Sequence, residues 1–223
     1  MGQADRVAQL ADGREIPYPL FMLAALLLWN FFSATVSSAS MSLIANAGIV
    51  RKIYFPRLIM PLSSAGATLM DATITFGLLI ILMAWYAMGA TYFLLLIPLL
   101  CLSILLAALG IGLFLSALSV TYRDFKYVVP FLMSIWMYIS PVFWAYEQAY
   151  EYFDKNNLAS YKWLLNINPV SGTINLFRRI ILAQPITDQA LISWAISATV
   201  SIICFIFGLM YFLRIERKFA DIA

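Results

Sequence analysis

The side chains that could carry out chemistry in this 223-residue chain are few, and they do not form a reactive set. Histidine is absent, which removes the commonest general base and the commonest metal ligand. Cys101 and Cys204 lie in apolar runs without a Cys-x-x-Cys neighbour, so we expect buried free thiols. No G-x-x-x-x-G-K-[ST] motif occurs, so the chain carries no nucleotide-binding P-loop. We therefore expect no enzyme, no catalytic or metal-binding residue and no cofactor in this chain.

Asp71 is the one acid inside a long apolar stretch. An acid in a membrane-spanning segment usually faces the interior of a helix bundle or an aqueous path. We expect Asp71 to be structural or to face a pore, with the hydroxyls of Thr68, Thr73 and Thr75 near enough to satisfy it. Proton coupling would need further ionisable groups, so an ion-coupled transporter and a two-aspartate intramembrane enzyme are both disfavoured.

A short basic stretch, residues 46–57, separates two long apolar segments. Arg51, Lys52 and Arg57 fall within seven positions, with no acid among them. Asn46 can cap a helix start, and apolar residues follow it at helical spacing. The stretch suits docking onto a cytosolic protein, although an ordinary loop attracted to anionic lipid explains it equally well.

Aromatic side chains are dense near residues 136–153. Tyrosine and tryptophan gather at the interfaces of any membrane protein, which explains several of them. Ring faces also stack on the apolar faces of sugars, so a sugar path is the alternative. The candidate contacts in this region are Trp136, Tyr138, Trp144 and Tyr146.

Small residues line parts of two apolar segments, for example Gly110, Gly112, Ser116 and Ala117. Small faces let helices approach closely. We favour this packing role over a hydroxyl-lined polar path.

The elements that position these residues are helices in a membrane. The chain is 63% hydrophobic and only 11% charged, whereas a soluble domain carries about 25% charged residues. A spanning helix needs ~20 apolar residues. We therefore predict an all-α polytopic membrane domain over residues 17–213, after a polar extracytoplasmic segment at 1–16 and before a cytosolic tail at 214–223. The predicted spans are residues 18–45, 58–88, 92–120, 127–146 and 191–213.

Residues 163–183 do not fit a lipid-facing span. Asn168, Pro169 and Gly172 interrupt the apolar pattern, and Arg178 and Arg179 lie near its middle. We expect short re-entrant or interfacial helices, with a sixth span as the alternative.

Positive charge gathers on one side of the predicted spans, in residues 46–57, 122–126 and 214–218. The positive-inside rule places this side in the cytosol, together with the C-terminus. The turn at 122–127 is too short for a domain, and Arg123 and Asp124 there can pair with each other or with a partner. This topology exports Met1 without a signal, so we expect the chain to be a fragment or to miss an upstream start.

Six stretches in this order resemble the membrane subunits of type-2 ATP-binding-cassette exporters, in the branch that moves O-antigen, capsular and teichoic polymers. They are P-Y-P-L-F (17–21), W-N-F-F (29–32), N-A-G-I-V-R-K-I-Y-F-P-R-L-I-M-P (46–61), S-V-T-Y-R-D-F-K-Y-V-V-P (119–130), S-P-V-F (140–143) and N-I-N-P-V-S-G (166–172).

The resemblance implies a homodimer joined by two copies of a separate ATPase subunit, which binds ATP and magnesium. It also implies sugar contacts by pore aromatics, including Trp29 and Phe32, with Asp71 as a further channel candidate. Asn168, Pro169, Gly172, Arg178 and Arg179 would belong to re-entrant helices at the periplasmic exit. The residues that would couple to the ATPase are Asn46, Gly48, Ile49, Arg51, Lys52, Tyr54, Phe55, Arg57, Tyr122, Arg123 and Asp124.

Members of that family have an amphipathic helix and a first spanning helix before the segment that resembles residues 17–45. We expect both to be missing here, and the missing helix would line the channel. The sequence as a whole predicts a multi-pass permease of the bacterial inner membrane that exports polymeric or lipid-linked polysaccharide, contacts membrane lipids and binds no nucleic acid. A permease of the same type for drugs or small lipids is the alternative.

Overall fold

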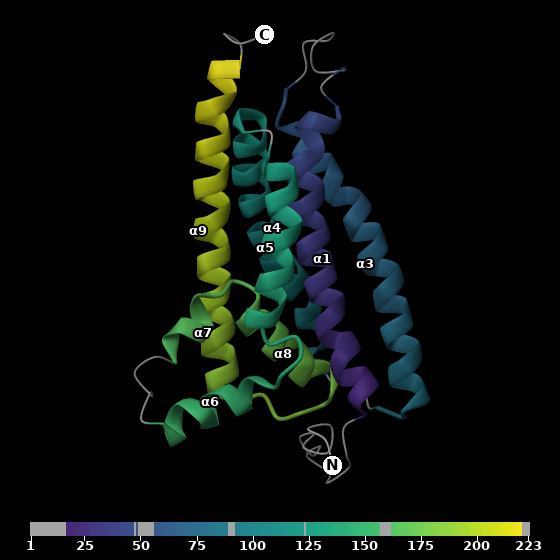
Figure 1. The fold of residues 1–223 in the computed structure, drawn as a ribbon. Helices are drawn as coiled ribbons and strands as arrows, with labels where there is room; N and C mark the ends of the chain where they lie inside the picture. The colour runs from purple at the N-terminus through teal and green to yellow at the C-terminus, as the bar shows by residue number, and fades with distance from the viewer. Residues whose placement is uncertain are drawn as a thin grey trace.

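The structure is a computed structural model, and it describes residues 17–46, 48, 56–88, 92–122, 124–156 and 162–219. Every regular element within these ranges is a helix (Figure 1). The long ones are α1 (Tyr18–Ala45), α3 (Ile59–Trp85), α4 (Ile97–Thr121), α5 (Phe125–Ile139) and α9 (Asp188–Phe219), and the 3₁₀ helix η2 (Tyr92–Leu96) precedes α4. The predicted all-α class is confirmed.

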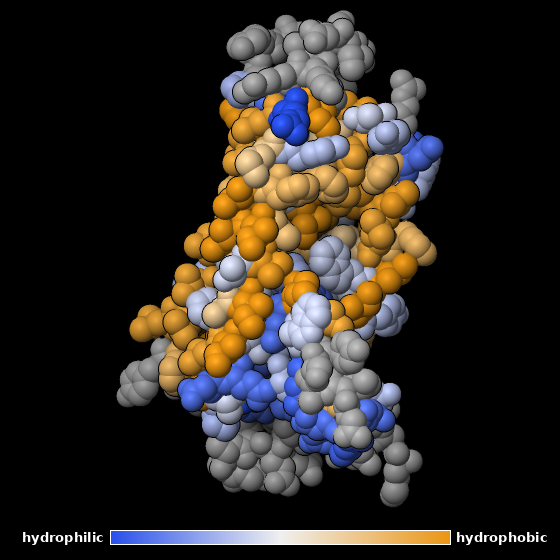
Figure 2. Space-filling view, turned by 90° about the vertical axis from the view of Figure 1, so that its left-hand side faces the viewer, coloured by the Kyte–Doolittle hydropathy of each residue, from blue (hydrophilic) through white to orange (hydrophobic). Residues whose placement is uncertain are grey.

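Four helices in the described part of the chain are long and apolar enough to cross a membrane: Tyr18–Ala45, Ile59–Trp85, Phe93–Thr121 and Asp188–Glu216. Apolar side chains dominate the middle of the face shown in Figure 2, and hydrophilic ones gather towards its ends. This is the surface that a bilayer requires of a protein that crosses it several times.

The fourth predicted span, residues 127–146, is shorter in the structure. Helix α5 ends at Ile139, and Ser140 has the extended backbone (φ −81°, ψ 152°) that a following proline imposes. The chain turns through residues 140–145 and begins α6 (Tyr146–Lys155). At 15 residues, α5 is about 22 Å long, which is less than a ~30 Å hydrocarbon core.

Helix α4 packs mainly against α1 and α9, while α3 packs mainly against the other side of α1 and only slightly against α4 (Figure 1). The position of each helix decides how much of it is covered. In the most apolar 18-residue window of α1, 56% of the residues are buried, against 17% in that of α3. Helix α3 is therefore an outer helix of the single chain and packs mainly on α1.

Glycines hold α4 against both of its neighbours. A Cβ atom added to Gly208 of α9 would lie 1.9 Å from the Gly110 carbonyl oxygen, and one added to Gly110 would lie 2.5 Å from the Cys204 backbone. On the other side, a Cβ on Gly112 would approach the Ala39 Cβ of α1 to 2.7 Å. The small residues of this segment therefore serve close helix packing.

Three short helices gather at one end of the bundle, where α1 and α9 begin (Figure 1). They are α6, α7 (Trp163–Ile167) and α8 (Ser171–Ile181). We call this end, which carries α6, α7 and α8, the α8 end. The opposite end carries Asn46 after α1, Arg57 before α3, Tyr122 after α4 and Glu216 near the end of α9, and we call it the Arg57 end.

Candidate functional site

Helix α8 is held at its place by a glycine and by serines of α9. A Cβ atom on Gly172 would lie 2.3 Å from the Ser193 carbonyl oxygen, so only glycine allows this approach. The Gly172 N–H donates a hydrogen bond of 3.1 Å to Ser197 Oγ, and the Ser197 hydroxyl donates to the Asn168 carbonyl oxygen at 3.0 Å. The start of α8 is thus fixed to α9 through main-chain and hydroxyl groups.

Arg178 is buried at 4% exposure, in a cage of main-chain carbonyl groups. Its Nη1 donates to the carbonyl oxygens of Pro141 (2.7 Å) and Trp144 (3.0 Å), and its Nη2 donates to that of Val142. Its Nε donates to the Phe21 carbonyl oxygen at 3.2 Å, and the guanidinium carbon lies 3.7 Å from the centre of the Phe21 ring.

This cage joins α8 to the start of α1 and to the turn that follows α5. Burial lowers the pKa of Arg178 to about 9, against the opposing field of Glu147, and the group remains charged at neutral pH. An arginine in this position would be costly in lipid, and the carbonyl dipoles compensate for its charge.

Arg179, the next residue, has a different environment. Its Nη2 lies 2.6 Å from Glu147 Oε1 at the start of α6, and its Nη1 donates to the Pro185 carbonyl oxygen at 2.6 Å. Its Nε is buried and has no hydrogen-bond partner among the described residues. The two adjacent arginines therefore tie α8 to two different neighbours.

The remaining residues of the predicted re-entrant set lie beside them. Asn168 donates from Nδ2 to Ser140 Oγ at 2.9 Å and accepts the Val170 N–H at 3.1 Å, and Pro169 is buried. The five residues predicted for this segment thus lie together at one end, in α8 and in the turn that precedes it. Whether this segment dips into a bilayer stays a prediction.

The sequence reasoning missed the partners of this segment. Residues 140–143 and Phe21 were noted only within stretches that carry the family resemblance, and nothing in the sequence marked them as contacts of α8. Ser193, Ser197 and Ser201 were a usable signal, because serines four residues apart mark one face of the otherwise apolar α9.

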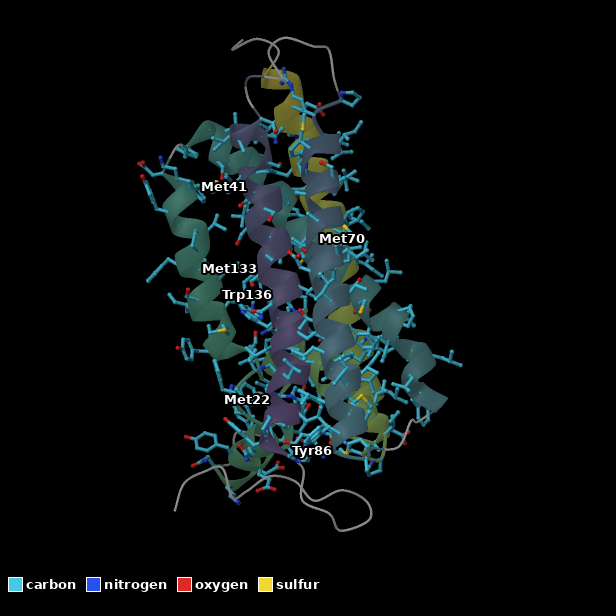
Figure 3. The ribbon with its side chains drawn as sticks, turned by 90° about the vertical axis from the view of Figure 1, so that its right-hand side faces the viewer. Met22, Met41, Met70, Tyr86, Met133 and Trp136 are labelled. Carbon is cyan, nitrogen blue, oxygen red and sulfur yellow. The ribbon has the colours of Figure 1, made fainter. Side chains whose placement is uncertain are left out.

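The predicted sugar-contacting aromatics divide into separate groups. Trp29 and Phe32 are buried, and the Phe32 ring meets that of Trp136 edge-on, with centroids 5.4 Å apart. Figure 3 shows Trp136 on α5 directed towards α1. Tyr138 is 67% exposed, and its carbonyl oxygen accepts a hydrogen bond from Trp144 Nε1 at 3.3 Å.

Tyr146, the seventh predicted channel residue, is buried in a polar cluster. Its hydroxyl donates to Asn166 Oδ1 and, at 3.3 Å, to Ser193 Oγ. Burial raises its pKa. Channel contacts by any of these aromatic residues stay a prediction.

Asp71 is exposed on α3, on the same outer helix as Met70, which is 71% exposed (Figure 3). The expectation that nearby threonines satisfy its carboxylate was wrong. Thr73 donates to the Leu69 carbonyl oxygen and Thr75 to that of Asp71 itself, because a threonine in a helix can reach the main chain four residues earlier. Thr68 instead shares a 2.7 Å hydrogen bond with Thr35 of α1.

The Arg57 end collects the described members of the predicted coupling set. Asn46 follows the last residue of α1, and its Nδ2 donates to the Ser42 carbonyl oxygen at 2.8 Å. In this contact Asn46 caps the end of a helix, whereas the sequence suggested that it could cap the start of one. Tyr122 (59% exposed) and Asp124 are on the surface, as is Gly48. Arg57 donates to Glu216 from its main-chain N–H and from Nη1, both at 3.3 Å. The predicted residues Ile49, Arg51, Lys52, Tyr54, Phe55 and Arg123 lie outside the described residues.

Comparison with known proteins agrees with the resemblance found in the sequence. The chain is 26% and 24% identical, each over 210 residues, to two O-antigen export system permease proteins RfbA of Klebsiella pneumoniae; each match covers 93% of this chain and 77% of the relative. It is 24% identical over 196 residues to the protein of the same name from Myxococcus xanthus, covering 83% of this chain and 73% of the relative. The sequence pattern of a family described as "ABC-2 type transporter" matches residues 2–182. This multi-pass membrane protein therefore belongs to the ABC-2 type transporter family.

Proposed function

We propose that this chain is the permease subunit of an ATP-driven exporter that moves O-antigen-like polysaccharide, polymeric or lipid-linked, across the bacterial inner membrane. The observation that carries the proposal is the similarity over most of the chain to relatives named as O-antigen export permeases, within a matching family. None of the three relatives named above favours the alternative cargo of drugs or small lipids.

A separate ATPase subunit supplies the energy in this proposal, since the chain has no P-loop. Two copies of the ATPase bind ATP with magnesium and dock at the cytosolic Arg57 end of two copies of the permease. The grouping of Asn46, Arg57, Tyr122 and Asp124 at one end supports this assignment, because one docking surface requires sites from separate parts of the chain to lie together.

The glycan path lies between the two copies, and among the predicted aromatic contacts the exposed Tyr138 suits its lining, whereas Trp29, Phe32 and Tyr146 are buried within the single chain. Asp71 fits a position on this path, because it lies on the outward surface of α3 and no described side chain donates a hydrogen bond to its carboxylate. The α8 end is the periplasmic exit. The C-terminus is then cytosolic.

Export can be tested in a bacterial strain that synthesises O-antigen but lacks its own permease. Expressing this chain with an ATPase subunit that co-purifies with it should bring the polymer to the cell surface, which surface-specific antibody measures. An ATPase variant that cannot hydrolyse ATP is the control and should leave the polymer inside. Absence of surface polymer, with both subunits present in the membrane, would contradict the proposal.

Coupling at residues 46–57 can be tested by charge reversal. Arg51→Glu with Lys52→Glu should reduce co-purification of the ATPase and surface polymer by about 10-fold or more, since like charges across a docking surface cost several kcal/mol. Membrane insertion should be unchanged. Arg214→Glu, an exposed charge at the same end, is the matched control and should have a smaller effect. Unaltered export by the double variant would remove the coupling role.

A further inference from the structure

A cavity of about 260 Å³ lies at the α8 end, bounded by α6, α8 and the first residues of α9. These three helices approach one another at the base of the bundle in Figure 1. Tyr146, Asn175 and Gln189 contribute to the lining from the three helices in turn. None of the residues predicted as sugar contacts, apart from Tyr146, borders this cavity.

The wall formed by α6 carries three carboxylates. Glu147, Glu151 and Asp154 are spaced by four and three residues, so they share one face of the helix, and all three border the cavity. Side-chain amides border it as well, from Asn175 on α8 and Gln189 on α9. Carboxylate oxygens accept hydrogen bonds and amides both donate and accept, so the lining can hold several hydroxyl groups at once.

Two polar groups at the cavity have no partner within the described part of the chain. Asn175 is only 6% exposed, yet its side-chain amide makes no hydrogen bond to a described residue. Arg179 Nε is buried and unbonded in the same way, although the other nitrogens of its guanidinium bind Glu147 and Pro185. A polar group without a partner in the protein is costly, and Asn175 borders the cavity, so its amide favours a ligand there; Arg179 Nε is fully enclosed by the described residues and is not reached from the cavity.

The charge around the cavity disfavours an anionic ligand. The lining holds three carboxylates and the two cations Lys162 and Arg179, and the third carboxylate, Glu151, pairs at 3.2 Å with Lys155, which is not part of the lining. Both cations are also engaged: Lys162 Nζ lies 2.7 Å from Asp154, and Arg179 Nη2 lies 2.6 Å from Glu147. A phosphate, for example that of a lipid headgroup, would find both cations of the lining already paired, whereas a neutral ligand rich in hydroxyl groups needs no free cation.

The tyrosine rings at the cavity are not available for stacking. The Tyr150 ring lies 5.0 Å from the Tyr146 ring between centroids, and Lys162 Nζ lies 4.9 Å from the Tyr150 centroid. Recognition here must therefore rest on hydrogen bonds to hydroxyl groups. The volume is slightly below the ~300–1,000 Å³ of sites for drug-sized ligands, which suits a single ring with its hydroxyls.

We propose that the cavity between α6, α8 and α9 binds one neutral sugar unit of the exported glycan at the exit of the permease. The proposal rests on the function proposed above and places a sugar site away from the aromatic residues. Asn175, Gln189 and the α6 carboxylates hold the hydroxyl groups of the sugar. The rest of the polymer continues out of the cavity past the exposed Glu147 and Glu151.

The test uses the permease–ATPase complex in lipid nanodiscs, with methyl glycosides of neutral hexoses as probes. Binding is measured by saturation-transfer NMR, and export is measured in cells with the same variants. Asn175→Ala and Gln189→Ala should each weaken hexoside binding about 5- to 10-fold, the equivalent of one lost hydrogen bond, and should lower export. Gln148→Ala is the matched control, since Gln148 is an exposed glutamine of α6 that does not border the cavity.

Gln189 is exposed and at the first turn of α9, so its variant tests the site even if Asn175→Ala lowers the yield of folded protein. If the unaltered complex exports glycan while both cavity variants bind and export like Gln148→Ala, the sugar site is excluded and the proposed function stands. If the unaltered complex exports no glycan, the proposed function and the sugar site both fail. Competition by glycerol phosphate that Asn175→Ala abolishes would identify a headgroup site instead and overturn the inference.

Discussion

At the scale of single residues, Arg178 shows how a full charge is kept inside this protein. Its hydrogen bonds go to four carbonyl oxygens of α1 and of the turn after α5, and none of the described ion pairs includes it. The guanidinium group suits this role, because its five N–H donors point outwards in one plane. The charge is therefore balanced by dipoles that belong to the backbone.

Replacement of Arg178 by glutamine should destabilise the protein by ~3 kcal/mol or more, because a hydrogen bond to a charged group contributes ~1.5–3 kcal/mol and several are lost together. The stability of Arg178→Lys should lie between that of the unaltered protein and that of the glutamine variant, since an ammonium group keeps the charge but cannot reach four separated carbonyls. Thermal unfolding of the detergent-solubilised protein measures the effect.

Arg179→Gln is the control for this prediction. Its ion pair with Glu147 is partly exposed, with the Glu147 side chain 47% accessible, so its loss should cost about 1 kcal/mol or less. Equal destabilisation by the two substitutions would show that the carbonyl cage contributes nothing beyond an ordinary surface contact.

At the scale of elements, the contact between α4 and α9 depends on two glycines that face each other. Gly110 and Gly208 bring the two backbones so close that any side chain would overlap main-chain atoms, which are much harder to displace than the end of a flexible side chain. Close approach of this kind replaces the hydrophobic effect as the source of helix association in lipid.

Gly208→Ala and Gly110→Ala should each lower the unfolding temperature and the yield of folded protein, by an amount typical of overpacking, about 1–3 kcal/mol or more. Gly77→Ala is the matched control, because an added Cβ there meets nothing within 4 Å. It should be neutral or slightly stabilising, since alanine favours the helix. A comparable loss at Gly77 would mean that helix propensity, and not the contact between α4 and α9, decides the outcome.

The sequence predicted the apolar part of each long helix but not always its ends. Helix α1 has the predicted bounds, whereas α9 runs from Asp188 to Phe219 and exceeds the predicted 191–213 at both ends. Hydropathy marks the residues that lipid accepts, while a helix continues into water as long as its backbone bonds are made. For α5, the apolar and aromatic residues predicted a span to residue 146, but the helix ends before Pro141. Hydropathy does not report that the residue before a proline disfavours helical backbone angles.

The sequence predicted which residues belong to the candidate site, but it did not predict the groups that they contact. The interrupted apolar pattern of residues 163–183 identified Asn168, Gly172 and Arg178 as candidate site residues, because such residues do not suit a lipid-facing helix. Their partners are main-chain groups and α9 serines more than twenty residues away, which only the fold brings together. The threonines near Asp71 are close to it in sequence but do not bind its carboxylate. On a helix, the hydroxyl groups of Thr73 and Thr75 bond main-chain carbonyl oxygens instead.

At the scale of the whole molecule, the two ends differ in construction. Arg57, Tyr122 and Asp124 lie at one end, and α6 with its three cavity-lining carboxylates lies at the other. The alternating course of α1, α3, α4, α5 and α9 requires that these ends face opposite sides of a membrane that the bundle crosses.

Cysteine labelling tests this arrangement. In a background with Cys101→Ala and Cys204→Ala, Lys155→Cys should react with a membrane-impermeant maleimide added to intact spheroplasts, while Asp124→Cys should react only after the membrane is opened. Both positions are exposed, so accessibility of the thiol itself does not limit the reaction. Labelling of Asp124→Cys in intact spheroplasts would reverse the orientation proposed from the distribution of positive charge.

Helix α9 has a mechanical consequence that follows from its length and its contacts. Its 32 residues contain no proline and extend about 48 Å, so it behaves as a stiff rod. Near one tip, Glu216 accepts hydrogen bonds from Arg57; near the other, Ser193 and Ser197 hold the short helices. A displacement of the residues before α3 should therefore be transmitted through this one helix to the opposite side of the membrane. The emission of a fluorophore placed beside Ser193 should then change when Arg57 moves.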